Sequence, residues 1–144
     1  MRIGRRALLV YGVSGLASGC VYFRWGAGHE LVASKGASVE DGVLRIPMEE
    51  LKPLEGGEAL LVKASDAHPE LLVAKAEGEF IVVTAECGHW GCTVDWTPAV
   101  KEWTCPCHGS RFNAQGEILE GPADEGLKSL KWEVVAGSLH VKLG

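Results

Sequence analysis

The sequence has no excess of positive charge, no internal repeat and no low-complexity tract. It carries 14 Lys+Arg against 19 Asp+Glu in 144 residues, a formal net charge of -5. Such a chain repels the phosphate groups that dominate affinity for nucleic acids, so nucleic-acid binding is disfavoured. Its charge favours basic protein surfaces or neutral ligands as partners. Its length leaves room for little more than one domain.

The first 25 residues differ from the rest of the chain. Three arginines among the first six residues precede an uncharged run from Ala7 to Phe23, which ends at Arg24. Such a run is close to the minimum length that crosses a membrane, and basic residues before it keep the N-terminus inside. Residues 1–25 therefore predict a single transmembrane helix in the inner membrane, with the following domain on the periplasmic side.

Two other interpretations of this run stay open. The pair Arg5-Arg6 resembles a twin-arginine export signal, which would be cleaved after export, and Cys20 is a candidate for a lipid anchor. An uncleaved anchor is favoured because no clear Ala-x-Ala cleavage site precedes Arg24. Residues 26–42, in which Gly, Ala and Ser predominate, are predicted to form a flexible tether.

Residues 43–144 predict an all-β fold, a small antiparallel sandwich or barrel. The expected strands are short apolar runs separated by turn signals, at residues 43–47, 59–62, 71–74, 80–85, 131–135 and 139–143. Pro47 ends the first run and predicts that it is an edge strand. Apolar residues follow one another from Phe80 to Val83, which predicts a strand that is covered on both faces.

Four of the five cysteines and two of the five histidines lie between residues 87 and 110. They form two motifs, C-G-H-W-G-C at Cys87–Cys92 and C-P-C-H-G-S at Cys105–Ser110. Thiolates and neutral imidazoles are ligands of zinc and of iron–sulfur clusters. We expect both motifs to be loops at one end of the β-structure, where they could bind one metal centre together.

Each motif supplies one cysteine and one histidine, Cys87 with His89 and Cys105 with His108. Many zinc fingers instead pair like ligands, two cysteines and then two histidines. A [2Fe–2S] cluster with two thiolates on one iron and two imidazoles on the other needs the two cysteines and two histidines that the motifs provide together. A structural zinc module without a redox role remains the alternative from a different class.

Cys92 and Cys107 occupy matching places, one in each motif. If the other ligands hold a cluster, these two could form a disulfide, which would fit an oxidising compartment; two free buried thiols are the alternative.

With these motifs, the chain resembles the Rieske [2Fe–2S] proteins, in particular the iron–sulfur subunit of bacterial cytochrome bc-type quinol:cytochrome c oxidoreductase complexes. The first motif of that family usually reads C-T-H-L-G-C, and the second reads C-P-C-H-G-S. Gly121-Pro122-Ala123 is similar to its proline loop. The resemblance extends from about Val43 to Leu143.

The resemblance implies roles for seven residues. Cys87 and Cys105 would ligate one iron, and His89 and His108 the other. Ser110 would donate a hydrogen bond to a bridging sulfide of the cluster. The last two, Cys92 and Cys107, would form the disulfide of the family.

The resemblance also implies a function. The chain would be an electron-transfer subunit rather than an enzyme on its own. It would accept an electron, with proton coupling, from quinol through His108 and pass it to a c-type cytochrome. Its neighbour in the respiratory membrane complex would be a cytochrome b-like subunit. The alternative within the same class is the small Rieske subunit of a periplasmic molybdenum oxidase of the arsenite oxidase type.

Four residues depart from the family pattern. Phe112 stands where high-potential members have a tyrosine that bonds a ligand sulfur, which predicts a lower reduction potential. Trp90 replaces a leucine beside the exposed histidine and predicts a bulkier docking surface. Gly88 replaces a threonine, and Asp124 replaces a second proline. None of these changes removes a ligand.

Overall fold

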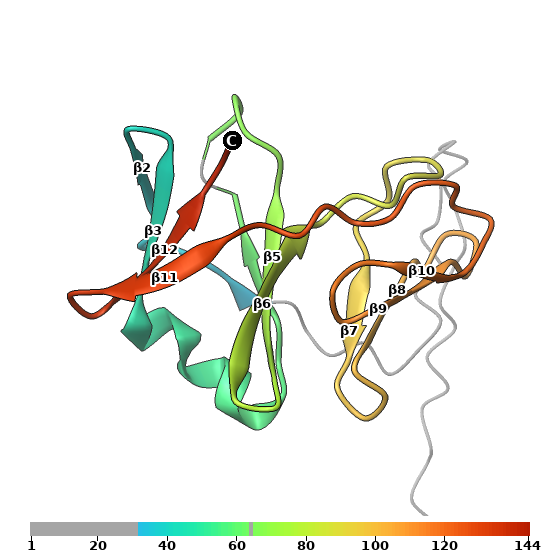
Figure 1. Ribbon diagram of the computed structural model, residues 1–144, viewed down its shortest axis with the longest axis horizontal. Coiled ribbons are helices and arrows are strands. Elements are labelled where there is room, and N and C mark those ends of the chain that lie inside the picture. Colours follow the sequence, from blue (N-terminus) through green and yellow to red (C-terminus); the bar gives the residue numbers. More distant parts are fainter. Residues whose placement is uncertain (1–31, 64) are drawn as a thin grey trace, which may run out of the picture.

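The computed structural model describes residues 32–63 and 65–144, and these residues form three four-stranded sheets (Figure 1). The central sheet has the order β1-β4-β5-β6, with bounds Val32–Ala33, Leu60–Val62, Leu71–Ala76 and Glu79–Thr84. The terminal sheet has the order β11-β12-β3-β2, with bounds Trp132–Val135, Ser138–Lys142, Val43–Pro47 and Ser38–Glu40. The loop-bearing sheet has the order β10-β9-β8-β7, with bounds Ile118–Glu120, Arg111–Asn113, Glu102–Thr104 and Asp95–Thr97.

The central sheet lies between the other two and is buried on both faces (Figure 1). On β5, Leu72 belongs to the hydrophobic cluster shared with the loop-bearing sheet, whereas Val73 belongs to the cluster shared with the terminal sheet. On β6, Val83 and Val82 divide in the same way. Successive side chains of a strand point to opposite faces, so only a strand covered on both sides buries all of them. This confirms the prediction from the consecutive apolar residues.

The predicted all-β architecture is confirmed, with strands close to the expected places. Almost all strand pairs are antiparallel; β1 pairs in parallel with β4. The hairpins β5–β6 and β11–β12 each turn on two residues with positive φ, Glu77-Gly78 and Ala136-Gly137. A 3-10 helix, η1 (Met48–Gly56), follows β3, and its Leu51 and Leu54 belong to the hydrophobic cluster of the terminal sheet.

The prediction that residues 43–47 form an edge strand is wrong. β3 lies inside the terminal sheet, between β12 and β2. Pro47 is tolerated there because it is the last residue of the strand, opposite Ser138, where the ladder ends. The second neighbour of β3 is a strand from residues 38–40, a segment with little apolar pattern of its own.

The predicted anchor, residues 1–25, lies outside the described residues. Among the residues that the structure does describe, no helix is long and apolar enough to cross a membrane. The predicted tether, residues 26–42, contains β1 and β2 in its described part. The boundary expected at Val43 therefore falls inside the β2–β3 hairpin, where Val39 packs against the core of the terminal sheet.

Candidate metal centre

The two cysteine motifs are loops with the same backbone shape. The first follows β6 and leads to β7, and the second joins β8 to β9. In the first loop the Cys87 N–H donates a hydrogen bond to the Cys92 carbonyl at 2.9 Å, and the Gly91 N–H donates one to the Cys87 carbonyl at 2.9 Å. In the second loop the same two bonds join Cys105 to Ser110 at 2.8 Å and Gly109 to Cys105 at 3.0 Å.

One glycine in each loop makes this shape possible. Gly91 and Gly109 have φ values of 71° and 79°, a left-handed conformation that glycine adopts without steric cost. The matched loops place Cys87 and Cys105 at equivalent positions, at the base of each loop. The same bonds match Cys92 with Ser110, so Cys92 and Cys107 do not occupy equivalent backbone positions.

Cys87 and Cys105 are the buried half of the centre, each with 2% of its surface exposed. Burial raises the pKa of the Cys105 thiol, and the adjacent Cys87 thiol raises it further. The N–H groups of Cys107 and His108 donate to the Cys105 sulfur and act in the opposite direction, because they stabilise a thiolate. Two adjacent buried thiols with amide donors directed at one sulfur form a site that favours a bound metal, since metals bind thiolates and supply the compensating positive charge.

His89 and His108 form the exposed half. Their Nδ1 atoms lie 3.2 Å apart, and their rings meet edge to face with centroids 4.8 Å apart. Two nitrogen ligands of one tetrahedral metal ion would be about 3.3 Å apart if each bond is about 2.0–2.1 Å long. Both Nδ1 atoms are therefore placed to bind one ion, and both Nε2 atoms face away from it.

Cys92 and Cys107 form a disulfide across the two loops, as predicted. Their sulfurs and that of Cys105 lie within 4.8 Å of one another. Because two of these three sulfurs are bonded to each other, the cluster of three cannot be the metal site. The side chains left to hold a metal are those of Cys87, His89, Cys105 and His108, which fit the two-thiolate, two-imidazole donor set of a [2Fe–2S] centre.

A third loop, residues 121–127, contacts both motifs. The Ala123 N–H donates to the Ser110 Oγ at 2.9 Å, and Ser110 is fully buried. Since this hydroxyl accepts one bond, its own proton is left to donate elsewhere. At the first motif, a Cβ on Gly88 would lie 2.7 Å from the Glu125 carbonyl oxygen. Glycine at position 88 thus lets the third loop rest directly on the first motif, a role that sequence reasoning missed because the partner is 37 residues away.

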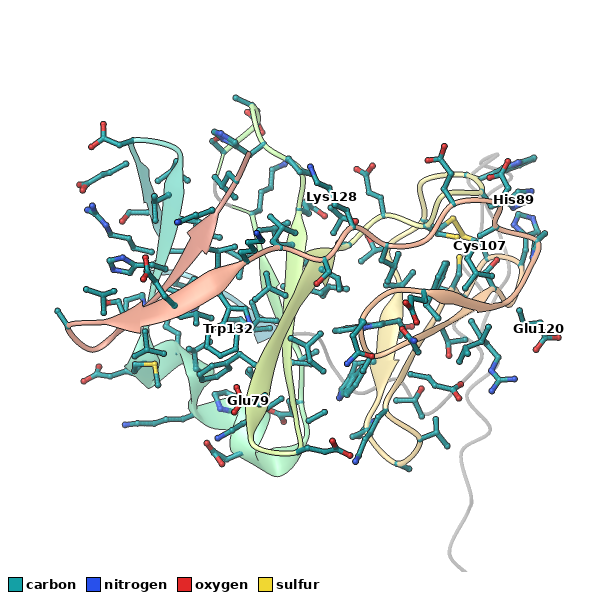
Figure 2. All side chains as sticks on the ribbon, in the orientation of Figure 1. Glu79, His89, Cys107, Glu120, Lys128 and Trp132 are labelled. Atoms are coloured by element: carbon teal, nitrogen blue, oxygen red, sulfur yellow. A yellow bond between two sulfur atoms is a disulfide. The ribbon has the colours of Figure 1, made fainter. Side chains whose placement is uncertain are left out.

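The other departures from the family pattern have clear structural settings. Trp90 has 76% of its surface exposed, stacks on the His89 ring at 5.6 Å and meets the His108 ring edge to face at 5.2 Å. His89 and Cys107 lie at the same end of the molecule (Figure 2). Phe112 is fully buried in the hydrophobic cluster that contains Cys87 and Cys105, and it brings no hydroxyl to that cluster.

Comparison with known proteins agrees with this geometry. The family model of the Rieske [2Fe-2S] domain matches residues 45–131. The chain belongs to the Rieske [2Fe–2S] family, and its cofactor is the [2Fe–2S] cluster that defines the family. The structural zinc alternative is therefore not retained.

Several relatives are named as iron-sulfur subunits of cytochrome b6-f complexes. The cytochrome b6-f complex iron-sulfur subunit 2 of Nostoc sp. is 33% identical over 91 residues, which cover 62% of this chain and 51% of the relative. The subunit of the same name from Trichormus variabilis is 31% identical and covers 70% of this chain and 62% of the relative. This chain thus spans about half to three fifths of the length of these relatives.

A solved structure, the cyanobacterial plasma membrane Rieske protein PetC3 from Synechocystis, matches with a TM-score of 0.55 and 30% identity. The match covers 67% of this chain and 94% of that one.

The contact between Gly88 and the third loop predicts the effect of Gly88→Ala. The added Cβ would meet the Glu125 backbone, so we expect the free energy of unfolding to fall by roughly 1–3 kcal/mol. Urea denaturation of the full chain measures it. Gly56→Ala is the matched control, because its Cβ would meet nothing within 4 Å. Equal stabilities of the two variants would contradict the contact.

The disulfide predicts a loss of stability in the double variant Cys92→Ser/Cys107→Ser. The bond closes a loop with a sequence separation of 15, for which the chain-entropy model gives about 3 kcal/mol. We expect a lower denaturation midpoint that no longer responds to reductant, whereas reductant should lower the midpoint of the wild type. A double variant that matches the oxidised wild type would show that the bond does not stabilise the loops.

Proposed function

We propose that this chain is the iron–sulfur electron-transfer subunit of a membrane quinol:cytochrome c-type complex. The observation that carries the proposal is the pairing of two buried thiols with two outward imidazoles at the tip of a Rieske domain. Relatives that are named as subunits of cytochrome b6-f complexes support it. The [2Fe–2S] cluster supplies a one-electron redox couple when it is bound.

The ligand roles follow from burial. Cys87 and Cys105 would hold the inner iron, because their sulfurs lie in the apolar core, where only a positively charged partner offsets the burial of thiolates. His89 and His108 would hold the outer iron through the Nδ1 atoms that face each other. Ser110 would direct its remaining hydroxyl proton towards the cluster, which favours the reduced, more negative state.

His108 would be the residue that meets quinol. Its side chain is exposed, and its Nδ1 faces His89, so its Nε2 faces away from the metal centre. The Trp90 indole stacks on the His89 ring, which is only partly exposed, whereas it meets the exposed His108 ring edge to face. The His108 Nε2 is therefore the accessible atom that could accept the proton of a quinol hydroxyl.

The anchor and partners belong to the same proposal. Residues 1–25 would place the domain on the periplasmic side of the inner membrane, beside a cytochrome b-like subunit that binds quinol, and the electron would pass to a c-type cytochrome. The charge of the first residues and the names of the relatives support this arrangement.

An EPR-monitored redox titration of the full chain in detergent, repeated across a range of pH, tests this function. We expect a Rieske-type signal with a midpoint within roughly −150 to +300 mV that falls as pH rises, because two imidazoles ligate one iron. A colourless, EPR-silent protein isolated under iron-replete conditions would refute the proposal. A midpoint near that of all-cysteine clusters would contradict the assignment of the imidazoles as ligands.

Phe112→Tyr tests the prediction that the absence of a tyrosine hydroxyl at position 112 lowers the reduction potential of the cluster. Position 112 is fully buried in the cluster that holds both cysteines, so a hydroxyl there is expected to donate to a ligand sulfur. One added hydrogen bond of about 1–2 kcal/mol would raise the midpoint of a one-electron couple by about 40–90 mV. Phe80→Tyr is the control, since Phe80 packs in the other hydrophobic cluster. Equal shifts in the two variants would contradict the explanation.

A further inference from the structure

The loops of the metal centre are bordered by exposed carboxylates. Between Glu86 and Lys128 the sequence has seven Asp+Glu and three Lys+Arg. Four exposed acidic residues directly flank the three loops, and we call them the acidic collar: Glu86, Glu120, Asp124 and Glu125.

Backbone contacts attach the collar to the loops that carry the two histidines. Glu86 directly precedes Cys87, and its backbone bridges to Thr93 across the first loop. Asp124 lies between Ala123, which is bonded to Ser110, and Glu125, whose backbone rests on Gly88. The collar is thus attached to both motifs and keeps its place relative to the metal centre.

Glu120 is attached through Arg111, whose guanidinium bonds both Glu120, at 3.1 Å, and Glu102, at 2.7 Å. One cation therefore faces two carboxylates. Lys128 lies farther back along the molecule than His89 and Glu120 (Figure 2), and its backbone is bonded to Thr84 of β6. Lys63 lines the same pocket as Glu86, whereas Asp124 and Glu125 form no ion pair with another described residue. With seven acidic and three basic residues, the segment from Glu86 to Lys128 has a net negative charge.

An apolar side chain stands inside the collar. Trp90 is the most exposed of the large hydrophobic side chains in the described part of the chain, and its ring contacts both imidazoles. A partner that approaches the His108 Nε2 must therefore touch the indole as well. Tryptophans that lose their contact with water on binding are among the strongest contributors to protein interfaces, particularly when surrounding residues exclude water from them.

We propose that this end docks a basic electron-transfer protein, whose lysines or arginines face the acidic collar around an apolar recess that takes the Trp90 indole. This inference rests on the proposed function and adds the charge and shape of the partner. The collar steers the approach over long range, and the indole holds the docked complex after the charges have met. One electron then passes from the reduced protein to the ferric haem of the partner, which becomes ferrous.

Stopped-flow absorbance measures this step with the full chain in detergent, reduced beforehand and mixed with a lysine-rich c-type cytochrome. The Debye length falls from about 30 Å at 0.01 M salt to about 8 Å at 0.15 M. We expect the second-order rate constant to fall at least about tenfold between 10 and 200 mM salt. An acidic c-type cytochrome of similar potential should react more slowly at 10 mM salt, and its rate should rise with salt.

Charge-reversal variants distinguish the effect of the acidic collar on the rate from the effect of the protein's net charge. Asp124→Lys/Glu125→Lys should slow the reaction at 10 mM salt at least about tenfold and remove most of the salt dependence. Glu49→Lys/Glu133→Lys makes the same change of charge on η1 and β11, at the opposite end of the molecule, and should keep more than about half of the rate. Asp124→Asn/Glu125→Gln keeps the shape of the loop and should weaken the salt dependence in the same direction.

The role of the indole is tested where the charges are screened. Trp90→Ala should lower the rate constant at 200 mM salt about tenfold, whereas Trp90→Phe should retain most of it. The midpoint potential and EPR signal of each variant are measured alongside, so that a change of driving force is not taken for a change of docking.

Three results would overturn the proposal of this docking surface. They are a wild-type rate that is independent of salt, a control pair on η1 and β11 that slows transfer as much as the collar pair, and a Trp90→Ala variant with the wild-type rate. Each of these leaves the electron-transfer proposal intact if the Rieske signal is present. Absence of that signal in the wild type would instead overturn the proposed function.

Discussion

The burial of two adjacent thiols is the constraint on which the rest of this domain depends. Cys87 and Cys105 lie in the same core cluster as the tryptophans of β7 and β8, and each is almost inaccessible to water. Burial and the neighbouring Cys87 thiol raise the pKa of Cys105, whereas the amide donors at Cys105 stabilise the thiolate form that binds a metal. The two buried thiols thus form a site that a metal would stabilise by binding them as thiolates. The loop-bearing sheet holds the two halves of that site in place.

Three independent connections keep the site together. The disulfide joins the two motif loops at their exposed side, the Ser110 hydroxyl joins the second motif to the third loop, and the contact at Gly88 joins the third loop to the first motif. Each connection links a different pair of the three loops, so they close a ring around the metal centre. The third of these contacts requires glycine at position 88, because the Cβ of the family's usual threonine would lie 2.7 Å from the Glu125 carbonyl oxygen.

The sequence was sufficient for the features that depend on local chemistry. Ligand types and spacing indicated the centre, and alternation and turn residues indicated the β-domain. The presence of one further cysteine in each motif, Cys92 and Cys107, indicated the disulfide. The sequence was insufficient where long-range packing decides. β3 became an inner strand because the weakly patterned residues 38–40 pair with it, and the role of Gly88 depends on a loop that arrives from residues 121–127. Neither partner is visible in the local pattern.

The same long-range packing connects the centre to its surroundings. Because the third loop rests on Gly88, its residues 124 and 125, both exposed, are held next to the first motif, which carries His89. A bulkier residue at position 88 would displace the loop and the charges together. The departures at positions 88, 90 and 124 therefore act on one surface: glycine brings the loop close, aspartate contributes charge in place of the family's proline, and tryptophan provides the apolar contact. With the family's threonine at position 88, the acidic loop would lie farther from the metal centre. With the family's leucine at position 90, the apolar contact would be smaller. Such a chain should select a basic partner less strongly, even with all four ligands unchanged.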